Sequence, residues 1–111
     1  MSVIEHIKVN CIKQEDWTGT DDLKFYLNGI HVGSKDGIAS GDVADVDKTY
    51  LWGELWVDEG TVLKIEEFDL DRNDVLLEYR ITSSDISSGS VSLRDQLSGA
   101  EYEFTVHFVE F

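Results

Sequence analysis

The feature that most constrains the fold of this chain is an alternation of apolar and polar residues that recurs along most of its length. In residues 23–27, three apolar side chains share one parity, with a lysine and a tyrosine between them. A period of two places alternate side chains on opposite faces of an extended strand, so the pattern predicts half-buried β-strands. We find no convincing helix of ten residues or more, so the chain is expected to be all-β.

Turn residues divide the alternating pattern into about seven or eight short strands. The predicted strands cover residues 3–13, 23–27, 30–32, 50–57, 61–68, 75–81, 91–93 and 101–111. The pair Asn28–Gly29 predicts a tight hairpin, because both turn positions require positive φ. Residues 33–48 are rich in Gly and Asp and predict a long surface loop, and residues 82–90 predict a serine-rich connector. Short strands with this spacing predict an antiparallel two-sheet β-sandwich.

The length of the chain limits its organisation. A chain of 111 residues has room for one hydrophobic core, so residues 1–111 are expected to form a single domain. Its only cysteine, Cys11, excludes an intramolecular disulfide and argues against a cysteine-based zinc site. No apolar run is long enough to span a bilayer, and the N-terminus lacks the pattern of a signal peptide. A soluble protein is therefore expected.

The charge of the chain is strongly acidic. The chain contains nine Lys and Arg residues and 23 Asp and Glu residues, which gives a formal net charge of -14. Nucleic-acid binding requires clustered cations, so the composition argues against a nucleic-acid partner. Anionic membranes attract basic segments, so unaided docking on such a surface is also not expected.

Two short segments concentrate carboxylates between predicted strands. Residues 16–22 and residues 69–74 each hold three aspartates within one tight connection. Like charges at such spacing repel unless a cation neutralises them, and Ca²⁺ accepts six to eight oxygen ligands from short acidic loops. Aspartate also favours turns for reasons of its own, so acidic turns without a ligand remain an alternative at this point.

The two segments together resemble the calcium loops of the C2 domain, a calcium-dependent β-sandwich module. The first C2 loop has the pattern Asp-x-x-Gly-x-x-Asp before a strand, and Asp16, Gly19 and Asp22 have that spacing. The other loop begins Asp-x-Asp and ends with an aspartate before an apolar strand, as residues 69–74 do. The short second loop and the tight hairpin are more similar to compact bacterial C2-like modules than to eukaryotic membrane-targeting ones.

The resemblance implies a calcium site at one end of the sandwich. Its implied ligands are five carboxylates, those of Asp16, Asp22, Asp69, Asp71 and Asp74. Asp21 is a possible substitute for Asp22, or a donor through its carbonyl oxygen. Trp17 lies within the first loop, where it could insert into a membrane or cover the end of the sandwich. On this basis Asp71→Asn is expected to weaken Ca²⁺ binding, and Asp36→Asn is expected not to.

The implied function is a non-enzymatic calcium-binding module in which one or two Ca²⁺ order or expose a surface for an unknown protein, glycan or lipid. The alternative is a calcium-independent interaction sandwich that uses an aromatic face formed by Trp52 and Trp56. Catalysis is not expected, because no nucleophile motif and no distinct carboxylate pair is present. The three histidines show no metal-ligand spacing in the sequence, and none is expected to bind metal.

Overall fold

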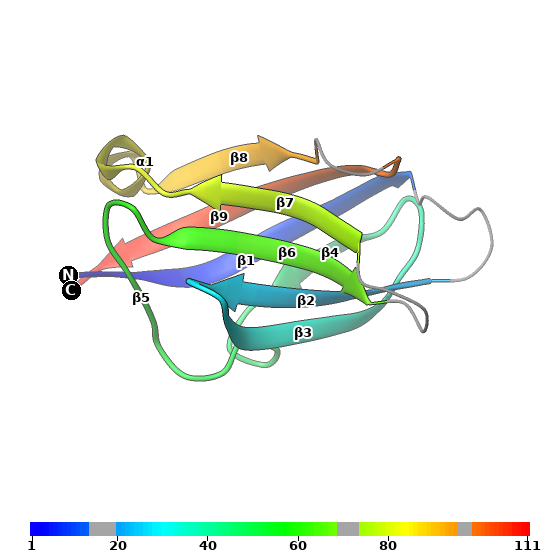
Figure 1. Cartoon of the computed structure of the whole chain (residues 1–111), viewed down its shortest axis with the longest axis horizontal. Helices are drawn as coiled ribbons and strands as arrows, with labels where there is room; N and C mark the ends of the chain where they lie inside the picture. The colour runs from blue at the N-terminus through cyan, green and yellow to red at the C-terminus, as the bar shows by residue number, and fades with distance from the viewer. Residues whose placement is uncertain (14–19, 69–73, 96–98) are drawn as a thin grey trace.

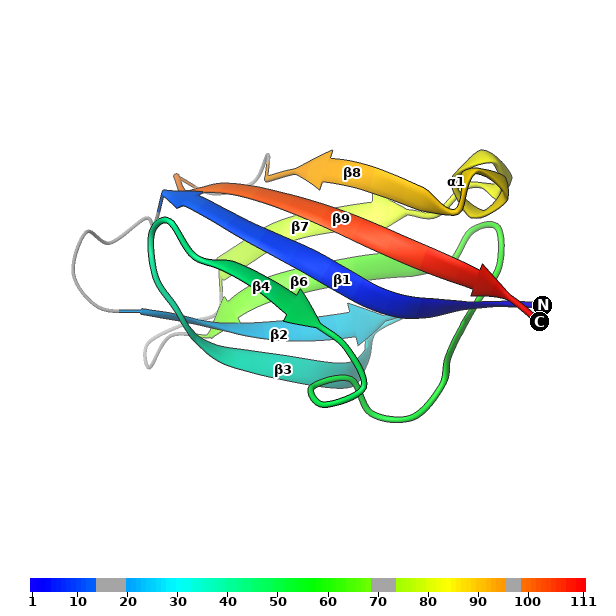
Figure 2. The ribbon, with the colours of Figure 1, turned by 180° about the vertical axis from the view of Figure 1, so that it is seen from behind.

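The computed structural model describes residues 1–13, 20–68, 74–95 and 99–111, which form two antiparallel β-sheets packed face to face (Figure 1). The first sheet has the order β4-β1-β9-β8 (Figure 2), and β5 pairs with the first residues of β1. Its strands are β1 (Ser2–Lys13), β4 (Val43–Val46), β5 (Leu55–Val57), β8 (Ser90–Arg94) and β9 (Glu101–Glu110). The second sheet, of order β3-β2-β6-β7, consists of β2 (Asp21–Leu27), β3 (Ile30–Ile38), β6 (Val62–Phe68) and β7 (Asp74–Arg80).

The core lies between the sheets, where alternate side chains of facing strands meet. In β2 the odd-numbered residues are buried, and in β9 the even-numbered residues from Tyr102 to Phe108 are buried. The predicted hairpin is confirmed, since Asn28 and Gly29 both have positive φ and join β2 to β3. The all-β sandwich predicted from the period-two pattern is therefore correct, and the described strands number nine.

Two regions differ from the prediction. Residues 33–48 are not a long loop, because β3 continues to Ile38 and β4 follows. Bulges in the β2–β3 pairing disturb the alternation there, so the sequence pattern does not predict this strand. The strand is stabilised by its backbone pairing with β2. Conversely, the strand predicted over residues 50–57 is reduced to β5, because Gly53 takes a φ of 77° and turns the chain.

The serine-rich connector contains one short helix, α1 (Ser83–Ser88). Thr82 and Asp85 form a reciprocal capping box at its start, and Gly89 ends it in the left-handed conformation. The helix buries none of its residues, which explains why no apolar periodicity marked it. Within the ranges given above, the structure contains no helix with the length and apolar character needed to cross a membrane.

The strand directions give the sandwich two distinct ends. At one end β1, β3, β6 and β8 finish and β2, β4, β7 and β9 begin (Figures 1 and 2). We call this the acidic end, because the strands that flank both aspartate-rich segments meet there. The chain termini lie at the opposite end, where Phe111 N–H donates to the carbonyl oxygen of Met1.

Candidate functional site

The pairing of β2, β6 and β7 brings together the strand ends that flank the two aspartate-rich segments. Asp22 at the start of β2 is opposite Phe68 at the end of β6, and Glu67 is opposite Asp74 at the start of β7. The first segment thus leads into β2, while the second connects β6 to β7, directly beside it. Segments separated by more than 40 residues in the sequence are flanked by neighbouring strand ends.

Asp22 is half-buried and held by the backbone of β3. Its Oδ1 accepts a hydrogen bond from Gly37 N–H at 3.0 Å. The bulge in β3 that supplies this donor also brings Asp36 to the acidic end. Asp36, whose replacement by Asn is expected not to weaken Ca²⁺ binding, therefore lies close to the proposed site, and a residue at the opposite end is a better control.

The predicted calcium ligands are only partly described by the structure. Asp22 and Asp74 lie at the acidic end, on β2 and β7, with β6 between them. The other predicted residues, Asp16, Trp17, Asp69 and Asp71, lie outside the described residues. No three described His, Cys, Asp or Glu residues lie close enough together to hold a metal ion by themselves.

Asp21 points in the opposite direction from Asp22, into the core. It is only 3% exposed, and its Oδ2 accepts a hydrogen bond from the hydroxyl of Tyr102 on β9. Burial, and then this hydrogen bond, raises the pKa of Tyr102 far above its usual range, so the hydroxyl remains a donor. The contact joins the two sheets, and the side chain of Asp21 would have to break it to replace Asp22. The carbonyl oxygen of Asp21 is not involved in this bond.

Further acidic groups that sequence reasoning missed lie beneath and beside the same end. Glu67 continues the inward parity of Leu63 and Ile65 and is only 7% exposed. Burial raises the pKa of the Cys11 thiol, a hydrogen bond with Tyr102 lowers it, and the charges of Asp21, Asp42 and Glu67 raise it further. The inward parity of Glu67 in an otherwise apolar row was the available sequence signal. Cys11 itself is fully buried, as its alternation with core residues suggests.

Asp42 belongs to the turn between β3 and β4, which also meets the acidic end. Its Oδ2 accepts a hydrogen bond from Ala39 N–H at 2.8 Å, and its carbonyl oxygen accepts one from Cys11 N–H at 2.9 Å. The turn is therefore fastened to the end of β1. It adds a third acidic connection to the two that the sequence picked out.

The similarity of this chain to known proteins lies in its fold. No family model matches the sequence, and no curated protein matches it. A solved structure described as that of a C2 domain matches with a TM-score of 0.57, at 11% identity, over 98% of this chain and 97% of that chain. The chain has a C2-like fold. At 11% identity the similarity concerns the fold, and it confirms the C2-like sandwich that the two aspartate-rich segments suggested.

The two tryptophans of the alternative hypothesis do not form one face of the C2-like sandwich. Trp52 packs edge-on against His31, with ring centroids 4.6 Å apart, and His31 stacks on Tyr26 of the second sheet. Trp56 belongs to β5 of the first sheet and contacts Phe111, with ring centroids 5.8 Å apart. The single aromatic face expected of them is therefore not formed, because the chain turns at Gly53 between them.

Proposed function

We propose that this protein is a non-enzymatic module that binds one or two Ca²⁺ at its acidic end, through Asp16, Asp22, Asp69, Asp71 and Asp74. The observation that carries the proposal is the adjacent position of the starts of β2 and β7 and the end of β6. A C2-like fold supports it, because C2 domains are typically non-catalytic interaction modules that often bind Ca²⁺.

The donor chemistry at the acidic end fits a hard divalent cation. Carboxylate oxygens are among the ligands that Ca²⁺ prefers, and Asp22 and Asp74 supply them there. Asp22 uses one oxygen for Gly37, which leaves its second oxygen for a metal ion. With five carboxylates, one Ca²⁺ would leave three net negative charges and two Ca²⁺ would leave one. The buried Asp21 and Glu67 add negative potential behind the site, which also favours a cation.

Bound Ca²⁺ would supply positive charge that neutralises the repulsion between the two loops and orders them. The surface so created would then be available to a protein, a glycan or a lipid. The net charge of -14 would become -10 with two Ca²⁺, so the module as a whole would remain acidic. A lipid partner would therefore require bridging by the metal or insertion of Trp17.

The proposal is tested by calorimetric titration with Ca²⁺. We expect Asp71→Asn and Asp74→Asn each to weaken binding by about tenfold or more, since each removes a charged ligand. The matched control is Glu59→Gln, which removes one negative charge from the turn between β5 and β6 at the opposite end. Equal loss in all three variants would mean that only the net charge matters, and would contradict the site.

A calcium-independent interaction module is the second candidate, and the exposure of Trp52 favours it. The side chain is 56% exposed although one of its edges contacts His31. Exposed tryptophans are enriched at protein interfaces. If Trp52 mediates self-association, light scattering in excess EGTA should show a mass that rises with concentration, and Trp52→Ser should abolish the rise. A constant mass in the unaltered protein would argue against this use of the tryptophan.

A further inference from the structure

Two histidines from opposite ends of the sequence meet on the outer face of the first sheet. His6 of β1 is directly opposite His107 of β9, and their rings stack with centroids 4.2 Å apart and planes inclined by 28°. The register of β1 and β9 shifts between Ile4 and His6, which makes Glu5 an extra residue in the pairing. A bulge of this kind redirects side chains, and here Glu5 is exposed beside the half-buried His6.

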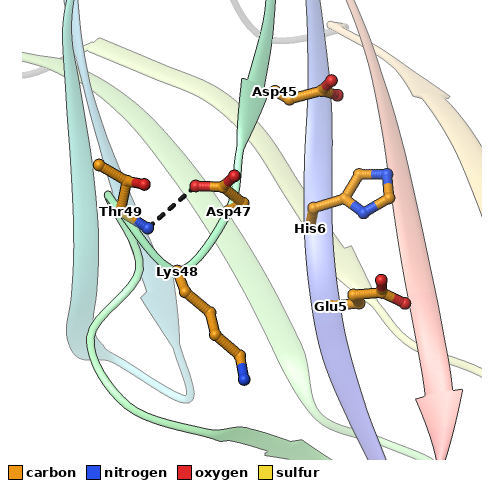
Figure 3. A pocket seen from close by; sticks show the side chains of 6 residues that line it. All are labelled: Glu5, His6, Asp45, Asp47, Lys48 and Thr49. Carbon is orange, nitrogen blue, oxygen red and sulfur yellow. Dashed lines mark hydrogen bonds between the residues drawn. The ribbon is translucent and has the colours of Figure 1, made fainter.

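Acidic side chains lie around one member of this pair, His6. A shallow surface pocket at His6 is lined by Glu5, Asp45, Asp47, Lys48 and Thr49 (Figure 3). Glu5, His6 and Asp45 point to the same side in this view, whereas Asp47 turns toward Thr49, whose N–H donates to its Oδ1 at 2.9 Å. Three carboxylates and one lysine therefore lie around His6, and this excess of negative charge favours a cation.

The ring nitrogens distinguish this pair from the third histidine. His31 uses its Nε2 for the carbonyl oxygen of Gly33 at 2.9 Å and for Ser34 Oγ at 3.0 Å. Within the part of the chain that the structure describes, the imidazole rings of His6 and His107 make no side-chain hydrogen bond, although their backbones pair between β1 and β9. Neutral imidazole nitrogens without a proton partner are preferred ligands of Zn²⁺ and of similar divalent transition metals.

We propose that His6 and His107 together bind a divalent transition metal of the Zn²⁺ class, with water completing the coordination. A tetrahedral zinc ion with Zn–N bonds of about 2.0–2.1 Å requires two nitrogens roughly 3.3 Å apart. In the stacked arrangement the ring planes are inclined by only 28°, so both rings have to rotate out of the stack before a nitrogen of each can point at one metal ion. The site has two protein ligands rather than three, and the carboxylates of Glu5 and Asp45 orient its water and balance its charge.

This site is distinct from the acidic end in both chemistry and place. Its nitrogen ligands suit Zn²⁺, whereas Ca²⁺ prefers oxygen ligands. It lies on the outer face of the sheet formed by β1 and β9, midway along both strands, and it cross-links them. Its failure would leave the calcium proposal unchanged.

The test is a calorimetric titration with Zn²⁺ in buffer that contains millimolar Ca²⁺, so that oxygen sites are already filled. We expect one Zn²⁺ per chain, and an affinity reduced by about tenfold or more in both His6→Gln and His107→Gln. The control is His31→Gln, which should bind as the unaltered protein does. Circular dichroism in EDTA checks that each variant is folded.

A second measurement uses the unaltered protein, so that it does not depend on the folding of any variant. The imidazole resonances of His6 and His107 should shift together on addition of Zn²⁺, while those of His31 stay in place. If Zn²⁺ does not bind, or binds equally to the three variants and moves all three histidines alike, the proposal is wrong. In that case the stacked rings are only a packing contact between β1 and β9.

Discussion

Millimolar Ca²⁺ should raise the midpoint of thermal unfolding by about 10 °C relative to excess EGTA. A ligand at about 100 times its dissociation constant stabilises the folded state by roughly 2.7 kcal/mol, because it binds only that state. The effect is expected here because the strand ends that flank the proposed ligands are brought together only when β2, β6 and β7 are paired. Differential scanning calorimetry of the same sample under both conditions gives the shift directly.

Mg²⁺ is the control for this measurement. It requires nearly octahedral geometry and gives up its water reluctantly, so a flexible set of carboxylates should favour Ca²⁺. An equal shift with Mg²⁺ would indicate general screening of the net charge of -14 rather than a calcium site. Coincident curves in Ca²⁺ and in EGTA would remove the proposed function and leave acidic turns on a C2-like sandwich.

Tyr102→Phe should lower the free energy of unfolding by about 2 kcal/mol, although it deletes a single oxygen atom. The hydroxyl of Tyr102 donates to Asp21, a side chain that is 3% exposed between the sheets. A buried polar group that loses its donor retains its desolvation cost without compensation, and that cost exceeds the net value of the bond. Urea unfolding followed by tryptophan fluorescence measures the change.

A double variant separates the hydrogen bond from simple packing. Asp21→Leu combined with Tyr102→Phe removes both partners, so we expect it to be more stable than Tyr102→Phe alone. If the free energy of unfolding that the double variant loses equals the sum of the losses in the two single variants, the hydrogen bond between Tyr102 and Asp21 contributes little. The contact involves Asp21, the first residue of β2, at the acidic end, so Ca²⁺ titration of the same variants tests whether it also supports binding.

The class of the fold and most of the strands could be predicted from the sequence. Alternation alone located β1, β2, β6, β7 and β9, since burial of one face dictates a period of two. It failed at residues 33–48, where bulges and Gly33 and Gly37 interrupt the period and the strand is held by its neighbour's backbone. It also failed at α1, a helix held by its caps without a buried face.

The candidate site was likewise predicted only in part from the sequence. Local spacing was enough to pick out Asp22 and Asp74, because each stands beside a strand in a recognisable acidic connection. Spacing selected Asp22 and kept Asp21 as a possible substitute, and the structure shows that their side chains point to opposite faces of the same strand. The buried Glu67, by contrast, could have been noticed as a charge on the inward parity of β6.

What the sequence determined by itself is therefore local: the period of the strands, the hairpin at Asn28–Gly29 and the acidic connections. What only the tertiary structure decided is which distant segments face each other. His6 and His107 are 101 positions apart in the chain and show no ligand spacing, yet the β1–β9 register places them directly opposite. Periodicity reports which face a side chain occupies, whereas contact across strands depends on register, and bulges and long-range pairing set that register.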